Sequence, residues 1–231
     1  MFQVIDQTSD FLVIDKSPGI SMHKDQQEQG LVMLVQQALG IEQLYPVHRL
    51  DKMTSGLLVL AKHAAAASEL SKLFQQREVS KFYLAISDKK PGKKQGLVRG
   101  DMVKARRGSW KLSKACENPA LTQFFSHSLG GGLRLFLLKP HTGKTHQIRV
   151  AMKSVGAAIV GDERYHEVTE EVVDRGYLHA YSLSFNLQGR DYCFRCPPRI
   201  GELFQLAAAV EQISHWQQPE LLAWPVIPGQ P

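Results

Sequence analysis

Cysteine is scarce in this chain, which contains only Cys116, Cys193 and Cys196. A low and odd count argues against a disulfide framework and indicates a reducing compartment, so we expect the protein to be cytoplasmic. Cys193 and Cys196 form a C-x-x-C pair, which is a spacing found in zinc and redox sites. The pair has no second pair of ligands, and three residues apart on a strand the two thiols face opposite ways. We therefore expect two structural thiols and no metal site.

Long apolar runs are also missing. No stretch of 18 or more apolar residues is present, so we expect no membrane span. The first residues, MFQVIDQTSD, have neither a basic start nor a long apolar core, which argues against a signal peptide. Hydrophobic residues make up 43% of the 231 residues, and no repeat or low-complexity linker interrupts them. This is typical of a globular protein, so we predict one domain over residues 1–216 and a Pro-rich tail over 217–231.

An excess of acidic residues is absent as well. Lysine and arginine number 28 against 22 acids, which gives a net charge of +6. This moderate excess suits a polyanionic partner without requiring one. Residues 89–107 form the most basic segment, with Asp101 as its only acid and with the cations Lys89, Lys90, Lys93, Lys94, Arg99, Lys104, Arg106 and Arg107. From charge alone, this segment is either a solvated loop or a phosphate-binding surface.

Hydrophobic periodicity and turn residues predict short strands mixed with helices. Strands are expected at 11–14, 57–61, 79–86, 121–127, 133–138, 178–185 and 192–196. Helices are expected at 31–39, 64–77 and 203–216, and another should start with Thr145 as its N-cap and end before Gly156. Short strands joined by hairpins favour an α+β fold with a mixed, mostly antiparallel central sheet and flanking helices.

One stretch, HRLDKMTSGLLVLAK from His48 to Lys62, is the strongest candidate for a functional site. It predicts a charged loop that carries Asp51, then a tight turn at Gly56, then a buried strand. A carboxylate held on a loop at the edge of a strand is well placed to act as a nucleophile or general base. A surface salt bridge from Asp51 to Arg49 or Lys52 is the alternative that the residues leave open.

HRLDKMTSGLLVLAK resembles the signature of the RluA class of RNA pseudouridine synthases. Other blocks are similar to motifs of the same family: DFLVIDKSPGISMH, which ends at His23, then KFYLAI, LKPHTGKTHQIRVAM with GAAIVGDERY, and LHAYSLSF. The resemblance covers roughly residues 10–206, and the small RNA-binding domain that some relatives carry before the first motif is not expected. Two positions depart from the family pattern, since Lys144 replaces an Arg and Ala151 a His. These exchanges affect the choice of target RNA more than the chemistry.

The resemblance implies an enzyme that isomerises uridine in RNA to pseudouridine without a cofactor or metal, in a cleft of the pseudouridine synthase fold. It implies Asp51 as the catalytic nucleophile, Arg149 as its charged partner, and Tyr83 against the target base. The partner would be rRNA or tRNA, recognised at a stem-loop by a monomer. The RNA-binding candidates are His48, Arg49, Thr54, Lys81, His146, Gln147, Lys93, Lys94, Arg106 and Arg107.

Several alternatives remain open at the level of sequence. Tyr83 could be an ordinary core residue, because tyrosine packs well in strands, and Arg49 could fill the space of a flipped base or only contact phosphate. The chain could also be a catalytically idle RNA-binding module on the same fold. A third possibility is a glycosidase-like hydrolase, which would use two carboxylates and release free uracil.

Overall fold

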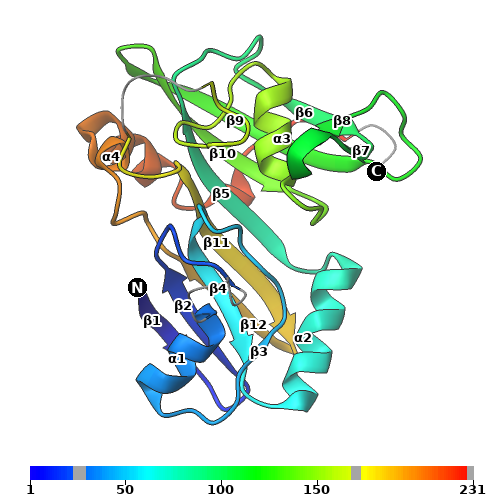
Figure 1. Cartoon of the computed structure of the whole chain (residues 1–231), viewed down its shortest axis with the longest axis vertical. Helices are drawn as coiled ribbons and strands as arrows, with labels where there is room; N and C mark the ends of the chain where they lie inside the picture. The colour runs from blue at the N-terminus through cyan, green and yellow to red at the C-terminus, as the bar shows by residue number, and fades with distance from the viewer. Residues whose placement is uncertain (23–29, 168–172, 228–231) are drawn as a thin grey trace. The chain divides into compact units, whose positions relative to one another are not determined.

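The computed structural model describes residues 1–22, 30–167 and 173–227. They fall into two units, each with its own strands (Figure 1): the first comprises Met1–Ser80 and His179–Pro198, the second Lys81–Leu178 and Arg199–Pro231. His23, at the end of the first motif, lies outside the described residues. The single catalytic domain predicted over 1–216 stays a prediction, and each unit is described here by itself.

The strands of the first unit follow the order β1-β2-β4-β11-β12, and β3 pairs with the far end of β4. Adjacent strands are antiparallel except β4 and β11, which are parallel. The apolar runs that predict β2 and β4 are buried along nearly their whole length. These strands are β1 (Phe2–Gln7), β2 (Phe11–Lys16), β3 (Tyr45–Pro46), β4 (Ser55–Ala61), β11 (Leu178–Leu187) and β12 (Arg190–Arg195). The expected α+β fold with a mixed, mostly antiparallel sheet is confirmed.

The described residues of the first unit contain two helices, and both were predicted. Helix α1 (Leu31–Leu39) ends at Gly40, which adopts the left-handed conformation (φ 64°) that glycine tolerates best. Helix α2 (Ala64–Gln76) begins after His63, whose Nδ1 accepts a hydrogen bond from the Ala66 N–H at 3.2 Å. A side-chain acceptor at this position satisfies one of the N–H groups that the first turn leaves without a partner.

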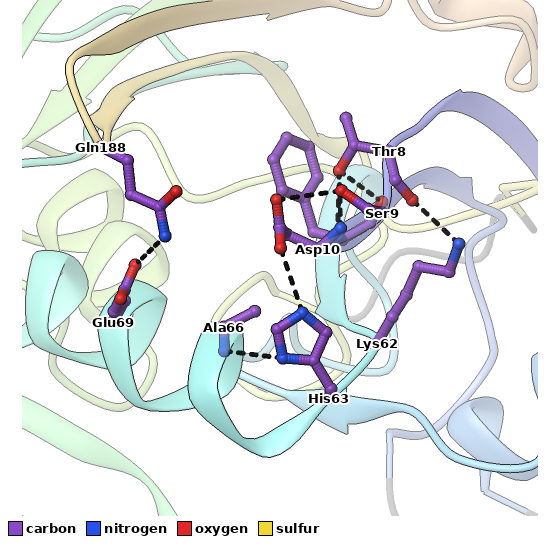
Figure 2. Close-up of polar contacts among 9 residues, drawn as sticks. Thr8, Ser9, Asp10, Lys62, His63, Ala66, Glu69 and Gln188 are labelled. Atoms are coloured by element: carbon purple, nitrogen blue, oxygen red, sulfur yellow. Dashed lines mark hydrogen bonds and ion pairs between the residues drawn. The ribbon is translucent and has the colours of Figure 1, made fainter.

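The start of α2 is tied to the turn between β1 and β2 (Figure 2). His63 Nε2 lies 3.0 Å from the Asp10 carboxylate, and Lys62 Nζ donates to the Thr8 carbonyl at 2.8 Å. Because the same imidazole accepts from Ala66 and contacts Asp10, one side chain joins the helix end to the hairpin. The end of β4 and the beginning of α2 are therefore both held to the turn between β1 and β2.

The second unit contains the sheet β5-β10-β9-β6, in which all neighbours are antiparallel, and a separate β7–β8 pair. The predicted hairpin at 121–138 is confirmed, with Gly131 and Gly132 in positive φ at its turn. Strands β6, β7 and β8 were missed because their short sequences lack the alternation of apolar and polar residues that marks longer strands. The strands are β5 (Ser80–Ser87), β6 (Gln95–Gly100), β7 (Met102–Lys104), β8 (Trp110–Leu112), β9 (Ala120–Gly130) and β10 (Leu133–Pro140).

The helices of the second unit differ from expectation in two places. Helix α3 (Gln147–Ser154) follows His146, so the predicted N-cap Thr145 is wrong. The helix predicted at 203–216 is divided into a 3-10 turn, Glu202–Gln205, and α4 (Ala207–His215). The division falls at Leu206, whose ψ of 136° is extended and cannot continue a helix. Among the described residues no helix is long and apolar enough to span a membrane.

Residues 217–227, the described part of the predicted Pro-rich tail, pack on the sheet of the second unit. They contain a 3-10 turn, Pro219–Leu221, and the Trp224 indole donates to the Pro219 carbonyl at 2.7 Å. The Trp224 ring lies 4.6 Å from Phe125 and 5.7 Å from Phe82, measured between ring centroids. Trp224 therefore covers the face of β5 that carries Phe82, which is the opposite face from that of Tyr83.

Candidate active site

The loop that carries Asp51 connects β3 to β4 in the first unit. Asp51 is half-buried, and its carbonyl accepts a hydrogen bond of 3.0 Å from the Thr54 N–H. Thr54 is 2% exposed. The loop therefore makes a closed turn between Asp51 and Thr54, in which Thr54 is buried. For Thr54 this favours a structural role over the RNA contact expected from the sequence.

The buried side chain of Lys16 holds the Asp51 loop through a hydrogen bond to its backbone. The Lys16 side chain is 0% exposed, and its ammonium donates to the carbonyls of Ser17 (3.0 Å), Ile20 (2.9 Å) and Lys52 (3.2 Å). The Gly19 N–H also donates to the Lys52 carbonyl at 2.8 Å. An ammonium group has three protons to donate, so three carbonyl acceptors satisfy its hydrogen-bonding capacity. Lys16 thus joins the turn after β2 to the residue that follows Asp51.

The T-S-G turn after Asp51 is locked by the L-H-A segment of β11. Ser55 Oγ lies 2.7 Å from His179 Nδ1, and His179 Nε2 lies 2.6 Å from the Cys196 carbonyl. The carbonyl can only accept, so Nε2 carries the proton and Nδ1 accepts from the serine hydroxyl. Gly56 has φ of 102°, and a Cβ there would lie 2.2 Å from the Ala180 carbonyl oxygen. Glycine is required at 56 because β11 approaches too closely for a side chain.

His48 and Arg49 have different environments although they are adjacent in the loop. His48 Nε2 accepts from the Val59 N–H at 2.9 Å, and its ring stacks on Phe74 of α2 with 4.3 Å between centroids. Arg49 is exposed. The contacts of His48 hold the loop against β4 and α2, and Arg49 has the exposure that an RNA contact needs.

In the second unit, Arg149 of α3 forms a buried ion pair with Asp162. Arg149 Nε and Nη2 each lie 2.7 Å from one carboxylate oxygen, and the two side chains are 9% and 0% exposed. Asp162 also accepts from the backbone N–H groups of Arg164 (3.0 Å) and Tyr165 (3.2 Å). The bidentate pair fixes the plane of the guanidinium. Asp162 was missed in the sequence analysis, although it stands in the GDERY block.

Asp162 bears on the hydrolase alternative because a glycosidase would use a second carboxylate as acid or nucleophile. The carboxylate of Asp162 is instead buried and accepts hydrogen bonds from a guanidinium and from two backbone N–H groups. A carboxylate that is enclosed and bonded in this way is poorly placed to reach a substrate. The arrangement makes Asp162 a support for Arg149.

Gln147, at the first position of α3, is 5% exposed. Its Oε1 accepts from the Thr142 hydroxyl at 2.6 Å and from the Lys144 N–H at 3.1 Å. Its Nε2 donates to the Leu121 carbonyl at 3.0 Å and to the Thr122 hydroxyl at 2.9 Å. The amide is thus satisfied inside the protein, which favours a structural role over the expected RNA contact.

Tyr83 and Lys81 lie on β5 and are both half-buried. Burial lowers the pKa of Lys81, and the same cause lowers the pKa of Lys139 on the neighbouring β10. His141 follows β10, and its pKa falls to about 4 through burial and the positive charges of Lys139 and Lys81. His141 Nε2 donates to the Gln123 side-chain oxygen at 2.6 Å. The Tyr83 strand is therefore flanked by positive charge.

The depressed pKa of His141 predicts an acid-sensitive contribution to stability. The unfolded chain takes up this proton near pH 6.5, whereas the folded chain resists it down to about pH 4. The contribution is therefore fully present above pH 6.5 and is lost as the pH falls toward 4. Solvent screening of the half-buried ring reduces the expected loss to about 1–2 kcal/mol. Urea unfolding at pH 7.0, 5.5 and 4.5 measures it.

The matched comparison for this prediction is His141→Gln against His127→Gln, since His127 is exposed on β9. The His141 variant should lose less stability than the wild type between pH 7.0 and 4.5, and the His127 variant should behave as the wild type. Equal pH dependence in all three proteins would contradict the assignment to His141.

The four candidate cations of the basic segment are exposed. Lys93 and Lys94 precede β6, and Arg106 and Arg107 lie in a 3-10 turn, Arg106–Gly108, between β7 and β8. The segment is thus built mainly of strands and tight turns, not of one loop. His146 precedes α3, and its Nδ1 lies 2.9 Å from the Tyr165 hydroxyl.

Apart from the four cations of the basic segment, the candidates fall into three groups. His48, Arg49, Asp51 and Thr54 share one loop of the first unit; Lys81 and Tyr83 share β5; and His146, Gln147 and Arg149 share the first turn of α3. Among the described residues no three His, Cys, Asp or Glu side chains are grouped to hold a metal ion. Cys193 is exposed and Cys196 is buried, which agrees with their expected opposite orientations.

The chain is similar in sequence to known proteins over most of its length. Residues 10–154 match the family model described as RNA pseudouridylate synthase. The chain is 52% identical over 211 residues to a protein of Haemophilus influenzae that is named an uncharacterized RNA pseudouridine synthase, covering 91% of this chain and 94% of that protein. It is 32% identical to the ribosomal large subunit pseudouridine synthase D of Borreliella burgdorferi, covering 80% of this chain and 61% of that protein.

A solved structure extends the comparison to three dimensions. The human RNA pseudouridylate synthase domain containing 1 protein superposes with a TM-score of 0.75 and 26% sequence identity. The superposition covers 93% of this chain and 94% of that one. The fold is therefore shared over nearly the whole length of both chains.

Proposed function

This chain belongs to the RNA pseudouridylate synthase family, and from that membership we propose that it isomerises specific uridines in rRNA or tRNA with Asp51 as its nucleophile. The observation that carries the proposal is that the matched region, residues 10–154, contains Asp51, Tyr83 and Arg149 together. The resemblance of its motifs to the RluA class agrees with the named relatives.

The reaction explains why no cofactor needs to be supplied. The bond between ribose C1′ and N1 of uracil breaks, the base turns, C1′ joins C5, and the proton on C5 leaves. Nothing is oxidised and no water is consumed, so we propose that the chain works without a cofactor or metal. The carboxylate of Asp51 would attack the sugar or the base, and it must be ionised to do so.

The contacts around Asp51 support this role. Lys16 and the Ser55–His179 bond hold the residues on both sides of the loop, so the carboxylate is carried by a rigid support. Arg149 supplies a permanent positive charge in a fixed orientation, set by Asp162. The pairing of Arg149 with Asp51 that the resemblance implies stays a prediction.

Tyr83 and Arg49 are proposed to act on the target nucleotide. The base must leave the RNA stack, which costs a few kcal/mol and is cheapest in a loop. Arg49, which is exposed, would occupy the vacated space or contact phosphate. Tyr83 would stack on the flipped base and take the C5 proton.

For the substrate we propose structured RNA bound at a stem-loop by a monomeric, cytoplasmic protein. Because one of the similar relatives is named a ribosomal large subunit pseudouridine synthase, large-subunit rRNA is the first RNA to examine. Pseudouridines should be mapped in total RNA from cells with and without the gene, and the deletion restored with wild-type protein and with Asp51→Asn. A site lost on deletion and restored only by the wild type supports the function. Binding without any such site would indicate an idle RNA-binding module, and released uracil a hydrolase.

RNA affinity is expected to fall steeply with salt, with a slope of log affinity against log salt near −0.7 for each single-strand phosphate neutralised. Replacing Lys93 and Lys94, or Arg106 and Arg107, by Gln should flatten the slope because fewer counterions are released from the RNA. Filter binding of the mapped RNA between 50 and 300 mM KCl (about a sixfold range) measures the slope.

The matched control is Lys72→Gln with Arg190→Gln, which removes two exposed cations from the first unit. This control should leave the slope unchanged. If the basic-segment variants also leave it unchanged, their side chains are solvated and take no part in binding.

A further inference from the structure

The two-stranded hairpin β7–β8 stands apart from the main sheet of the second unit and is strongly basic. We name residues 99–114 the basic arm. Its single acid, Asp101, is engaged by the backbone N–H groups of Glu117 (3.1 Å) and Asn118 (3.0 Å). Among the described residues no carboxylate lies within ion-pair distance of its six exposed cations, which are Arg99, Lys104, Arg106, Arg107, Lys111 and Lys114. The arm therefore presents uncompensated positive charge, as a phosphate-binding element does.

The basic arm is attached to the GDERY loop at two points. The Trp110 N–H donates to the Tyr165 hydroxyl at 2.8 Å, and Arg164 Nη1 donates to the Arg107 carbonyl. Figure 1 shows β7 and β8 beside α3, the helix that carries Arg149. One attachment point thus belongs to the turn that carries Arg106 and Arg107, and the other to β8.

Tyr165 connects this attachment to the candidate catalytic residues of α3. Its hydroxyl accepts from Trp110, so its own proton is available to His146 Nδ1, 2.9 Å away. Its ring lies 5.0 Å from the Arg149 guanidinium carbon, a cation–π distance. Tyr165 is 4% exposed, and burial raises its pKa, so the hydroxyl keeps its proton. One buried side chain therefore contacts the arm, the residue before α3 and Arg149.

We propose that Tyr165 is a positioning residue that couples RNA held on the basic arm to the placement of His146 and Arg149. This inference rests on the proposed function. The structure shows the arm attached through the Trp110–Tyr165 hydrogen bond, and the proposal requires a second, detached state in which this bond is broken. RNA phosphates that bind the arm better in its attached state shift the equilibrium toward it. The hydroxyl of Tyr165 is then fully engaged, and the side chains that contact it are held in one arrangement. By linkage, correct placement at α3 also favours the attached arm.

The test compares Tyr165→Phe, the arm variant Arg106→Gln with Arg107→Gln, and the triple variant. The probe is total RNA from cells lacking the gene, labelled with tritium at uridine C5, and the readout is tritium released to water. Phe keeps the ring under Arg149 and removes only the hydroxyl. With the arm intact, Tyr165→Phe should lower kcat about tenfold, the effect of losing one buried hydrogen bond from each of two partners. In the arm variant the same change should cost less than about twofold, because the coupling is already lost.

The matched control is Tyr177→Phe. Tyr177 is also buried, its hydroxyl donates to Asp174 and accepts from the Leu203 N–H at 3.1 Å, and its ring lies 5.8 Å from Arg175. It has no described contact with the arm, so its effect should be the same in both backgrounds. Hydrogen exchange of the Trp110 amide should be slow in the wild type and fast in Tyr165→Phe only.

The outcomes separate this inference from the function on which it rests. If the wild type releases no tritium, the proposed function fails. If it does, but Tyr165→Phe costs the same factor in both backgrounds, the coupling is overturned and Tyr165 is only structural. An unchanged Trp110 exchange rate in Tyr165→Phe would overturn it as well.

Discussion

Asp51→Asn should abolish pseudouridine formation, with a loss of at least about 10⁴-fold in turnover, the range seen when a nucleophile is removed. Asparagine has the shape of aspartate and keeps the loop, but its amide carries no negative charge and cannot attack carbon. RNA binding should be retained, because the cations proposed to contact phosphate are untouched. Tritium release from labelled RNA measures turnover, and filter binding measures affinity.

The control for this prediction is Asp6→Asn, which removes an exposed carboxylate from β1 of the same unit. It should turn over as the wild type does. Mass spectrometry should verify that the amide at position 51 of the variant is intact, since deamidation would regenerate the carboxylate. Near wild-type turnover by intact Asp51→Asn protein would show that another group is the nucleophile.

Tyr83→Phe has the second largest expected effect, a fall in turnover of about 10²–10⁴-fold, the usual result of losing a general base. The ring is kept, and stacking on an aromatic is worth about 1–3 kcal/mol per base whether the ring is Tyr or Phe, so RNA affinity should change little. Loss of the C5 proton would become slow. RNA deuterated at uridine C5 should then show a clear isotope effect in the variant.

Tyr192→Phe is the matched control, since Tyr192 is half-buried on β12 among aromatic residues of the first unit. It should have near-normal turnover. If Tyr83→Phe behaves in the same way and shows no isotope effect, Tyr83 only stacks on the base, and the proton leaves to water or to Asp51.

The local sequence predicted most secondary-structure elements, because their signals are local. The apolar runs of β2 and β4, the glycine that ends α1, and the Gly131-Gly132 turn each act within a few residues. Elements were missed where neighbouring sequence carries little signal. Strand β6 exists because it pairs with β9, which lies well further along the chain.

The candidate site also has a part that the sequence predicted and a part that it did not. The sequence and its resemblance picked out Asp51, Tyr83 and Arg149, since the motifs are continuous blocks. Nothing in those blocks shows which side chains turn inward. Gln147 and Thr54 looked like RNA contacts because they are polar residues within motifs, and only their burial and internal hydrogen bonds indicate a structural role.

By itself the sequence determined the family, the α+β class and the loop that presents Asp51, because spacing and hydrophobic pattern are fixed along the chain. The tertiary structure alone decided which partners the polar and charged side chains have. Lys16 meets Lys52 across 36 positions, and Ser55 meets His179 across 124. Asp162 forms an ion pair with Arg149. Tyr165 contacts both Trp110 of the basic arm and Arg149 of α3. A hydrogen bond forms between groups brought within about 3 Å of each other, and for residues far apart in sequence only the folded chain sets that distance.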